Sequence, residues 1–279
     1  PLGIFTGDFV FVGDIGRPDL LEEAAGLQGT ADVGARQMFK SIQRFKDLPD
    51  YMLVWPAHGA GSACGKSLGA VPISTVGYEK QFKWGLQIND EESFVQELLH
   101  EQPEAPVYFA QMKKLNKIGP ALVKNKDLPV IFESEELKSL MVEEDVLVID
   151  SRPEMIAQKN IIPQTINIPI NQQFTNWAGW IASYDERLVI IAEEAKREEV
   201  IIALQSIGLD RIVAFVDPAV IEQFDTVSYD TISLDSFLRE MEDEDTYVID
   251  VRNYAEWNAG HFKEANHHFI GHFRYTEIP

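Results

Sequence analysis

The stretch IFTGDFVFV, residues 4–12, decides how the first part of this chain folds. Its apolar runs, residues 4–5 and 9–12, predict two short buried strands separated by a turn at Gly7 and Asp8. A strand fixes the Asp8 carboxylate, and the turn opens space beside it. α/β folds commonly hold reactive and binding side chains at such places.

A second apolar run, residues 50–54, predicts another strand and leads into the turn WPAHG, residues 55–59. His58 therefore follows its strand as Asp8 follows its own. Carboxylate and imidazole groups both suit Fe(II) and Zn(II). Each residue alone is more typical of an ordinary turn than of a metal site, since Asp beside Gly favours turns. Together, Asp8 and His58 are candidate metal ligands.

Helical spacing of apolar residues surrounds these strands. Residues 31–45 are predicted to form a helix, and the side chains on or near its apolar face are Val33, Met38, Ile42 and Phe45. Asn89 or Asp90 is a candidate cap for a helix that runs to about His100. A shorter helix is expected over residues 108–115, before a boundary marked by Gly and Pro.

The second part of the chain contains an internal repeat. Residues 146–152 (VLVIDSR) recur as residues 246–252 (TYVIDVR), one hundred positions later. A helix-like segment that opens with Ser precedes each copy, at residues 134–141 and 233–241. The first copy continues through a strand, a helix and a strand, over residues 188–191, 194–207 and 212–216. The second copy stops before the equivalent of the next strand.

Composition excludes several classes of partner. The 279 residues carry 45 acidic and 24 basic side chains, a net charge of −21, which repels nucleic acid and anionic membrane surfaces. The length predicts about two domains. Cys64 is the single cysteine, which excludes an internal disulfide and fits the reducing cytoplasm. We expect a soluble, cytoplasmic protein that binds neither nucleic acid nor membrane.

Three strings in the first part carry a family resemblance: TGD at residues 6–8, GRPDL at 16–20 and PAHGAGSACGK at 56–66. They closely resemble the second half of the metallo-β-lactamase superfamily, in the branch of persulfide dioxygenases and glyoxalase II. By this resemblance, Asp8 is a metal ligand, and His58 is the histidine that binds the second metal in dinuclear members. Arg17 and Asp19 correspond to groups that orient the metal site and the pocket.

The resemblance implies an enzyme that oxidises low-molecular-weight thiol persulfides with O₂ at one non-haem Fe(II). The alternative is a glyoxalase II-like thioester hydrolase with two Zn ions, where Asp8 bridges the metals and His58 is an indispensable ligand. In the family, the other histidine ligands precede the TGD string, so we expect an incomplete site here, with no catalytic side chain. This chain alone is then expected to be inactive, or to act as a binding or assembly module.

The repeat resembles the rhodanese domain, with Asp150 and Arg152 in the first copy. The second copy has the equivalent pair, Asp250 and Arg252. It also matches the domain through His261. In that family these residues brace the loop that holds a reactive cysteine. The corresponding loop of the first copy, residues 192–197 (AEEAKR), has no cysteine and carries two acids that would repel a persulfide anion. We therefore predict a scaffold domain without sulfurtransferase activity.

The remaining candidates are interpreted as structural. The histidines after residue 260 are His261, His267, His268 and His272, and we assign them to the domain signature and the turn that follows it rather than to a metal. Cys64 is interpreted as a packed thiol, although the nearby Lys66 could make it redox-sensitive.

The predicted fold class is α/β, in three parts. Residues 1–125 form the C-terminal part of a metallo-β-lactamase αββα domain, residues 126–228 a rhodanese homology domain without the catalytic cysteine, and residues 229–279 the N-terminal half of a second rhodanese domain. Both ends are expected to be incomplete. Open sheet edges favour association, so we expect a homo-oligomer.

Overall fold

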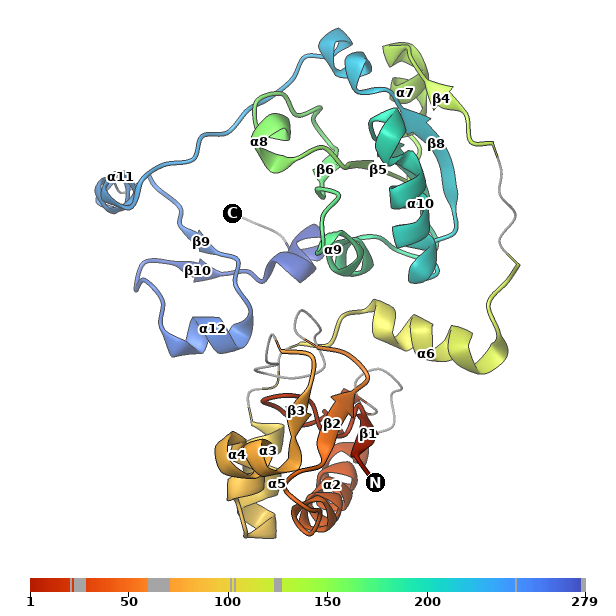
Figure 1. Ribbon diagram of the computed structural model, residues 1–279. Helices are drawn as coiled ribbons and strands as arrows, with labels where there is room; N and C mark the ends of the chain where they lie inside the picture. The colour runs from red at the N-terminus through yellow and green to blue at the C-terminus, as the bar shows by residue number, and fades with distance from the viewer. Residues whose placement is uncertain are drawn as a thin grey trace. The chain divides into compact units, whose positions relative to one another are not determined.

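A computed structural model of the chain describes residues 1–20, 22, 29–59, 71–100, 102, 104–122, 127–243 and 245–276 (Figure 1). It divides into two compact units, one formed by Pro1–Ala105 with Arg252–His261, the other by Pro106–Val251 with Phe262–Pro279. The predicted domain limits differ from this division and stay predictions. Among the described residues, no helix is long and apolar enough to cross a membrane.

The first unit contains a small three-stranded sheet in the order β1-β2-β3 (Figure 1). Strands β1 (Gly3–Gly7) and β2 (Leu53–Pro56) are parallel, and β3 (Ser74–Thr75) is antiparallel to β2. The predicted strand over residues 50–54 therefore begins later, because Met52 donates its N–H to Pro49 O in a turn (3.1 Å). The helices of the unit are α2 (Thr30–Lys46), α3 (Val76–Phe82), α4 (Trp84–Gln87) and α5 (Glu91–Leu99).

Helix α2 confirms the predicted periodicity, with one correction. Ala35, Ile42 and Phe45 are buried, and Met38 packs against the same core. Val33 is 55% exposed, because two residues before Ala35 is about 200° around the helix from the buried stripe. Helix α5 confirms its predicted cap: the Asp90 side chain accepts a hydrogen bond from the Ser93 N–H at 2.8 Å.

The predicted strand over residues 9–12 is wrong. The chain reverses there, since Phe11 donates its N–H to Asp14 O (2.9 Å) and Val10 forms an isolated antiparallel bridge with Ile15. Val10, Phe11 and Ile15 are all buried. The apolar run thus reflects burial of a tight loop rather than an extended strand.

The second unit is built on a five-stranded parallel sheet in the order β4-β8-β7-β5-β6 (Figure 1). Its strands are β4 (Val130–Ile131), β5 (Val146–Asp150), β6 (Ile166–Asn167), β7 (Arg187–Ile191) and β8 (Ile212–Val216). Central strands bury both faces, so β7 reads as a continuous apolar run with Leu188 and Ile190 in one core and Val189 and Ile191 in the other.

Helices cover the faces of this sheet: α7 (Ser134–Met141), α8 (Glu154–Ala157), α9 (Phe174–Ile181), η1 (Glu194–Lys196), α10 (Arg197–Ser206) and η2 (Pro218–Gln223). Helix α6 (Tyr108–Ile118) belongs to the same unit. Helix α6 packs closely against two glycines. A Cβ at Gly179 would meet the Tyr108 ring at 2.2 Å, and one at Gly208 would meet Leu115 at 2.5 Å.

The repeat is visible in the structure. Strand β9 (Ile249–Asp250) pairs in parallel with β10 (Asn266–His267), in the register that β5 has with β6. His268 N–H bonds to Asp250 O (3.0 Å), as Ile168 N–H bonds to Asp150 O (2.9 Å). The other elements of the second copy are α11 (Leu234–Glu240), α12 (Tyr254–Ala259) and η3 (Ile270–Tyr275).

Candidate functional site

Asp8 and His58 lie together in the first unit. β1 and β2 are parallel and pair Gly7 with Pro56, so both strands end at the same edge of the sheet. Asp8 Oδ1 is 3.6 Å from His58 Nε2. The Asp8 side chain is 73% exposed and that of His58 33%. The two strand ends therefore hold a carboxylate and an imidazole side by side, open to solvent.

The loop that carries Asp8 is fixed on both sides. Thr6 Oγ1 donates a buried hydrogen bond to Val10 O at 2.6 Å. Gly16 N–H donates to Phe9 O at 3.0 Å, and a Cβ at Gly16 would lie only 2.0 Å from Asp8 O. The backbone of Asp8 thus has little room to move, even though its side chain is exposed.

Arg17 and Asp19 pair with each other. The guanidinium donates from Nη2 to Asp19 Oδ2 at 2.5 Å and from Nε at 3.2 Å. The Arg17 side chain is fully buried and that of Asp19 nearly so. A buried fork of this kind fixes the direction of the chain as it leaves the Asp8 loop. Their predicted role in orienting the metal site stays a prediction.

A buried polar cluster, which the sequence did not predict, lies under the same loop. Lys83 Nζ is 2.9 Å from Glu79 Oε2 and donates to Phe11 O; both side chains are almost completely buried. Glu79 Oε2 also accepts from the Gly13 N–H at 3.2 Å. Burial lowers the pKa of Lys83, while Glu79 and Asp14 oppose that shift. No signal marked these residues, because Glu and Lys four positions apart are typical of a solvated helix face.

The donor set is suitable for a metal in kind but not in number. Carboxylate and imidazole are proper ligands for Fe(II) and Zn(II). Among the described residues, no group of three or more His, Cys, Asp or Glu side chains could hold a metal ion. Asp8 and His58 therefore stay predicted ligands, and the described residues alone do not complete a metal site around them.

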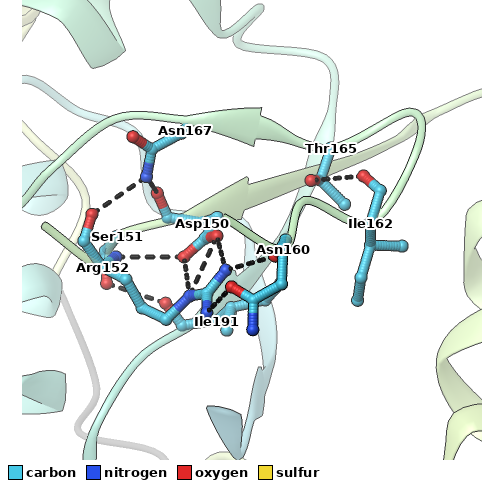
Figure 2. A network of polar contacts seen from close by, with 8 residues as sticks. All are labelled: Asp150, Ser151, Arg152, Asn160, Ile162, Thr165, Asn167 and Ile191. Atoms are coloured by element: carbon cyan, nitrogen blue, oxygen red, sulfur yellow. Dashed lines mark hydrogen bonds and ion pairs between the residues drawn. The ribbon is translucent and has the colours of Figure 1, made fainter. Parts of the chain in front are cut away.

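The rhodanese-like brace is well formed in the first copy. Figure 2 shows the Arg152 guanidinium between the Asp150 carboxylate and Asn160. Arg152 donates from Nη2 to Asp150 Oδ2 at 2.7 Å and to Asn160 O at 2.9 Å. Asn167 Nδ2 donates to Asp150 O and Arg152 O at 2.8 and 2.9 Å. Ser151 Oγ completes the network by donating to Ile191 O on β7.

The second copy keeps part of this pattern on the surface. Arg252 Nη2 donates to Gly260 O at 2.8 Å, as Arg152 does to Asn160 O. His261 Nδ1 is 2.8 Å from Trp257 O, and its ring stacks on that indole at 3.4 Å between centroids. These contacts are local. The structural role predicted for Asp250, Arg252 and His261 stays a prediction.

The loop after β7 carries the two acids noted in the sequence, and its predicted lack of sulfurtransferase activity stays a prediction. Ala192, at the end of the strand, is buried, and Glu193 and Glu194 are exposed. Arg197 is 3.7 Å from Asp217 and lies over the Phe215 ring at 5.7 Å. Cys64 and Lys66 lie outside the described residues.

The comparisons with known proteins bear on the fold. No protein-family model and no curated protein matches the chain. A solved structure of a metallo-beta-lactamase from Staphylococcus aureus subsp. aureus COL is 44% identical, with a TM-score of 0.68, over 78% of this chain and 60% of that one. The chain therefore spans about 60% of the length of that neighbour.

Two further solved structures match parts of the chain. The Alr3790 protein from Anabaena sp. is 16% identical, with a TM-score of 0.31, over 39% of this chain and 90% of that one. The Saccharomyces cerevisiae single domain sulfurtransferase RDL2 is 17% identical, with a TM-score of 0.28, over 34% and 86%. The predicted α/β fold class is confirmed, and the resemblance of the chain to a metallo-β-lactamase has support from the 44% identical neighbour. The rhodanese-like character of the later part stays a prediction.

Proposed function

We propose that this chain is part of a cytoplasmic enzyme that oxidises low-molecular-weight thiol persulfides with O₂ at a mononuclear non-haem Fe(II). The proposal includes a rhodanese module for sulfur transfer, of which the first copy is a scaffold. Its support is the match of the strings around Asp8, Arg17 and His58 to persulfide dioxygenases, together with the 44% identical metallo-beta-lactamase neighbour.

One observation carries the proposal. Asp8 and His58 are 50 positions apart in the chain, yet their side chains are 3.6 Å apart at one edge of the sheet. The pairing of β1 with β2 brings the two strand ends together, and the side chains found there are a carboxylate and an imidazole, both suitable ligands for Fe(II). Iron would supply the site for O₂ and the persulfide sulfur. Because the described residues hold only two donors, we derive no reaction step from them.

Oxygen consumption tests the proposal. The protein encoded by the whole gene, loaded with Fe(II), is given a thiol persulfide in an oxygen-electrode cell, and we expect consumption that Asp8→Ala abolishes. Lys138→Ala, which removes an exposed pair with Glu135 in the second unit, is the control and should consume oxygen normally. A wild-type protein that binds iron and consumes no oxygen would contradict the proposal.

The same distance favours a second candidate, a glyoxalase II-like thioester hydrolase with two Zn ions. In that chemistry His58 is a required ligand and Asp8 bridges the metals, so proximity of the two is expected. Metal content separates the candidates: one iron per chain supports the dioxygenase, whereas two zinc ions and thioester hydrolysis support the hydrolase. In an inactive binding or assembly module, neither metal would bind stoichiometrically.

A further inference from the structure

The loop between Asp8 and Gly16 rests on a buried ion pair that has no place in the proposed chemistry. Glu79 is in α3 and Lys83 follows the end of that helix. Side-chain exposures of 1% for Glu79 and 0% for Lys83 mean that both charges have lost their water. Such a pair gives little net stability, since desolvation offsets the attraction between the charges. A role other than net stability therefore has to be sought in its contacts.

The contacts of the pair are directed at the loop backbone. Lys83 Nζ donates to Phe11 O, and Glu79 Oε2 accepts from Gly13 N–H at 3.2 Å. The Asp14 carboxylate joins them, because its Oδ1 accepts from Trp84 Nε1 at 3.0 Å. Charged and polar side chains of the α3–α4 segment thus form hydrogen bonds with the tip of the loop.

Phe11 is the residue of this loop that contacts His58. Its ring is buried and lies 4.5 Å from the His58 imidazole, centroid to centroid, at an interplanar angle of 37°. Among the described residues, the polar contacts of the imidazole are long: Nε2 is 3.6 Å from Asp8 Oδ1 and Nδ1 is 3.4 Å from Gly59 O. The contact with the Phe11 ring therefore restrains the direction of the imidazole among these residues.

We propose that Glu79 and Lys83 are positioning residues, which fix Phe11 so that its ring holds the His58 imidazole toward Asp8. The inference concerns the site of the proposed function, and its importance for metal binding rests on that function. The position of the ring is independent of any metal and can be tested without one.

The first measurement is the NMR spectrum of His58 in the metal-free 279-residue chain. We expect an NOE between the Phe11 and His58 rings and shifts of the His58 ring protons caused by the ring current of Phe11. Both should disappear in Glu79→Gln/Lys83→Met, which removes both charges at similar volume and leaves no buried ion unpaired. Lys80→Met is the matched control: this lysine is on the same helix and binds Leu48 O and Asp50 Oδ1, each at 2.7 Å, away from the loop.

Unchanged His58 resonances in the folded double variant would overturn the proposal. Absence of the ring-to-ring NOE in the wild type would overturn it too, and this measurement needs no variant to fold. The single variant Lys83→Arg, which keeps a charged donor, should keep part of the NOE intensity of the wild type.

A titration with Zn(II) alone gives the functional readout. We expect the double variant to bind about 10–100-fold more weakly than the wild type, the usual loss when a group that orients a ligand is removed. Lys80→Met should bind as the wild type does. If the wild type binds no Zn(II) through His58 while the NMR effects hold, His58 is not a metal ligand in this chain and the positioning role stands. Failure of the proposed function is read separately, from the absence of oxygen consumption by the iron-loaded protein of the whole gene.

Discussion

At the scale of single residues, Gly16 is the tightest constraint on the candidate site. Replacing it with alanine would place a Cβ 2.0 Å from Asp8 O, far inside van der Waals contact. We expect Gly16→Ala to displace the Asp8 turn and to cost about 1–3 kcal/mol of unfolding free energy, measured by urea denaturation. Binding of Zn(II) should weaken in the same variant.

Gly59→Ala serves as its control. An added Cβ at Gly59 meets no atom of the described residues within 4 Å, so the free energy of unfolding should change by no more than about 0.5 kcal/mol. Equal stability of the two variants would show that the Asp8 loop yields easily, and that Gly16 does not fix it.

The two copies of the rhodanese-like brace offer a matched pair of substitutions. Arg152 is buried and bonded to Asp150, so Arg152→Leu leaves a buried carboxylate without its cation and should cost about 3–5 kcal/mol. Arg252 is exposed, and Arg252→Leu should cost at most about 1 kcal/mol. Urea denaturation of both variants measures the difference; similar losses would mean that the second brace is as buried as the first.

Residues of the site differ in how well sequence could predict them. Asp8 and His58 could be identified from the sequence, because each follows a strand and precedes a turn residue. Glu79 and Lys83 were not, since their spacing is that of an exposed helical pair. Only the fold shows that this helix turns its charged side inward, toward Phe11.

At the scale of elements, the contact between η3 and α9 includes one titratable ion pair, Arg274 with Glu186. Arg274 donates to Glu186 Oε1 at 2.6 Å and to Ile181 O at 2.6 Å. Burial raises the pKa of Glu186, but the hydrogen bonds from Arg274 and the Ser183 N–H outweigh it and lower that pKa below its usual value. The bond therefore stabilises η3 fully above the unfolded pKa of about 4.3 and is lost as pH falls through the folded value.

We expect η3 to loosen from α9 at pH values below the unfolded glutamate pKa of about 4.3, as the carboxylate takes up its proton. Fluorescence of Trp180 reports this, because its ring contacts Phe269 at 5.2 Å and His272 at 5.6 Å, between centroids. Glu186→Gln has no carboxylate to titrate and should show no transition in that range. A transition of equal size in Glu186→Gln would assign the change to other groups.

Elements were predicted where apolar period and burial agree. Helix α2 and strand β7 follow their patterns closely, because each has a clear buried stripe or two buried faces. Residues 9–12 have the letters of a strand but form a loop tip. The turn closed by Asp14 and the hydrogen bond from Lys83 to Phe11 O decide that conformation, and Lys83 is distant from the apolar run in the sequence.

At the scale of the whole molecule, buried apolar side chains are unevenly distributed. Among the described residues, the buried apolar side chains end at Ile221, although the second copy continues to residue 276. That copy instead exposes large apolar groups, among them Leu234, Tyr247 and Tyr254. The repeat was predictable from the offset of one hundred positions, but the difference in burial between its copies was not, because it depends on which strands are present to cover each sheet.

Hydrogen exchange should expose this difference through four amides with the same partners. Ile168 and Ile170 donate to Asp150 O and Ser151 O, and one hundred positions later His268 and Ile270 donate to Asp250 O and Val251 O. Their bond lengths lie between 2.9 and 3.1 Å, so differences in exchange report opening of the surrounding structure. We expect the later pair to exchange at least about tenfold faster, or ~1.4 kcal/mol in opening free energy.

The dependence on protein concentration separates two causes of any protection in the second copy. If the predicted homo-oligomer covers the apolar groups around β9, exchange at His268 and Ile270 should slow as concentration rises, while Ile168 and Ile170 stay unchanged. Equal exchange of both pairs at every concentration would contradict the expectation, because it would require a cover over β9 that neither the described residues nor a second copy of the chain provides.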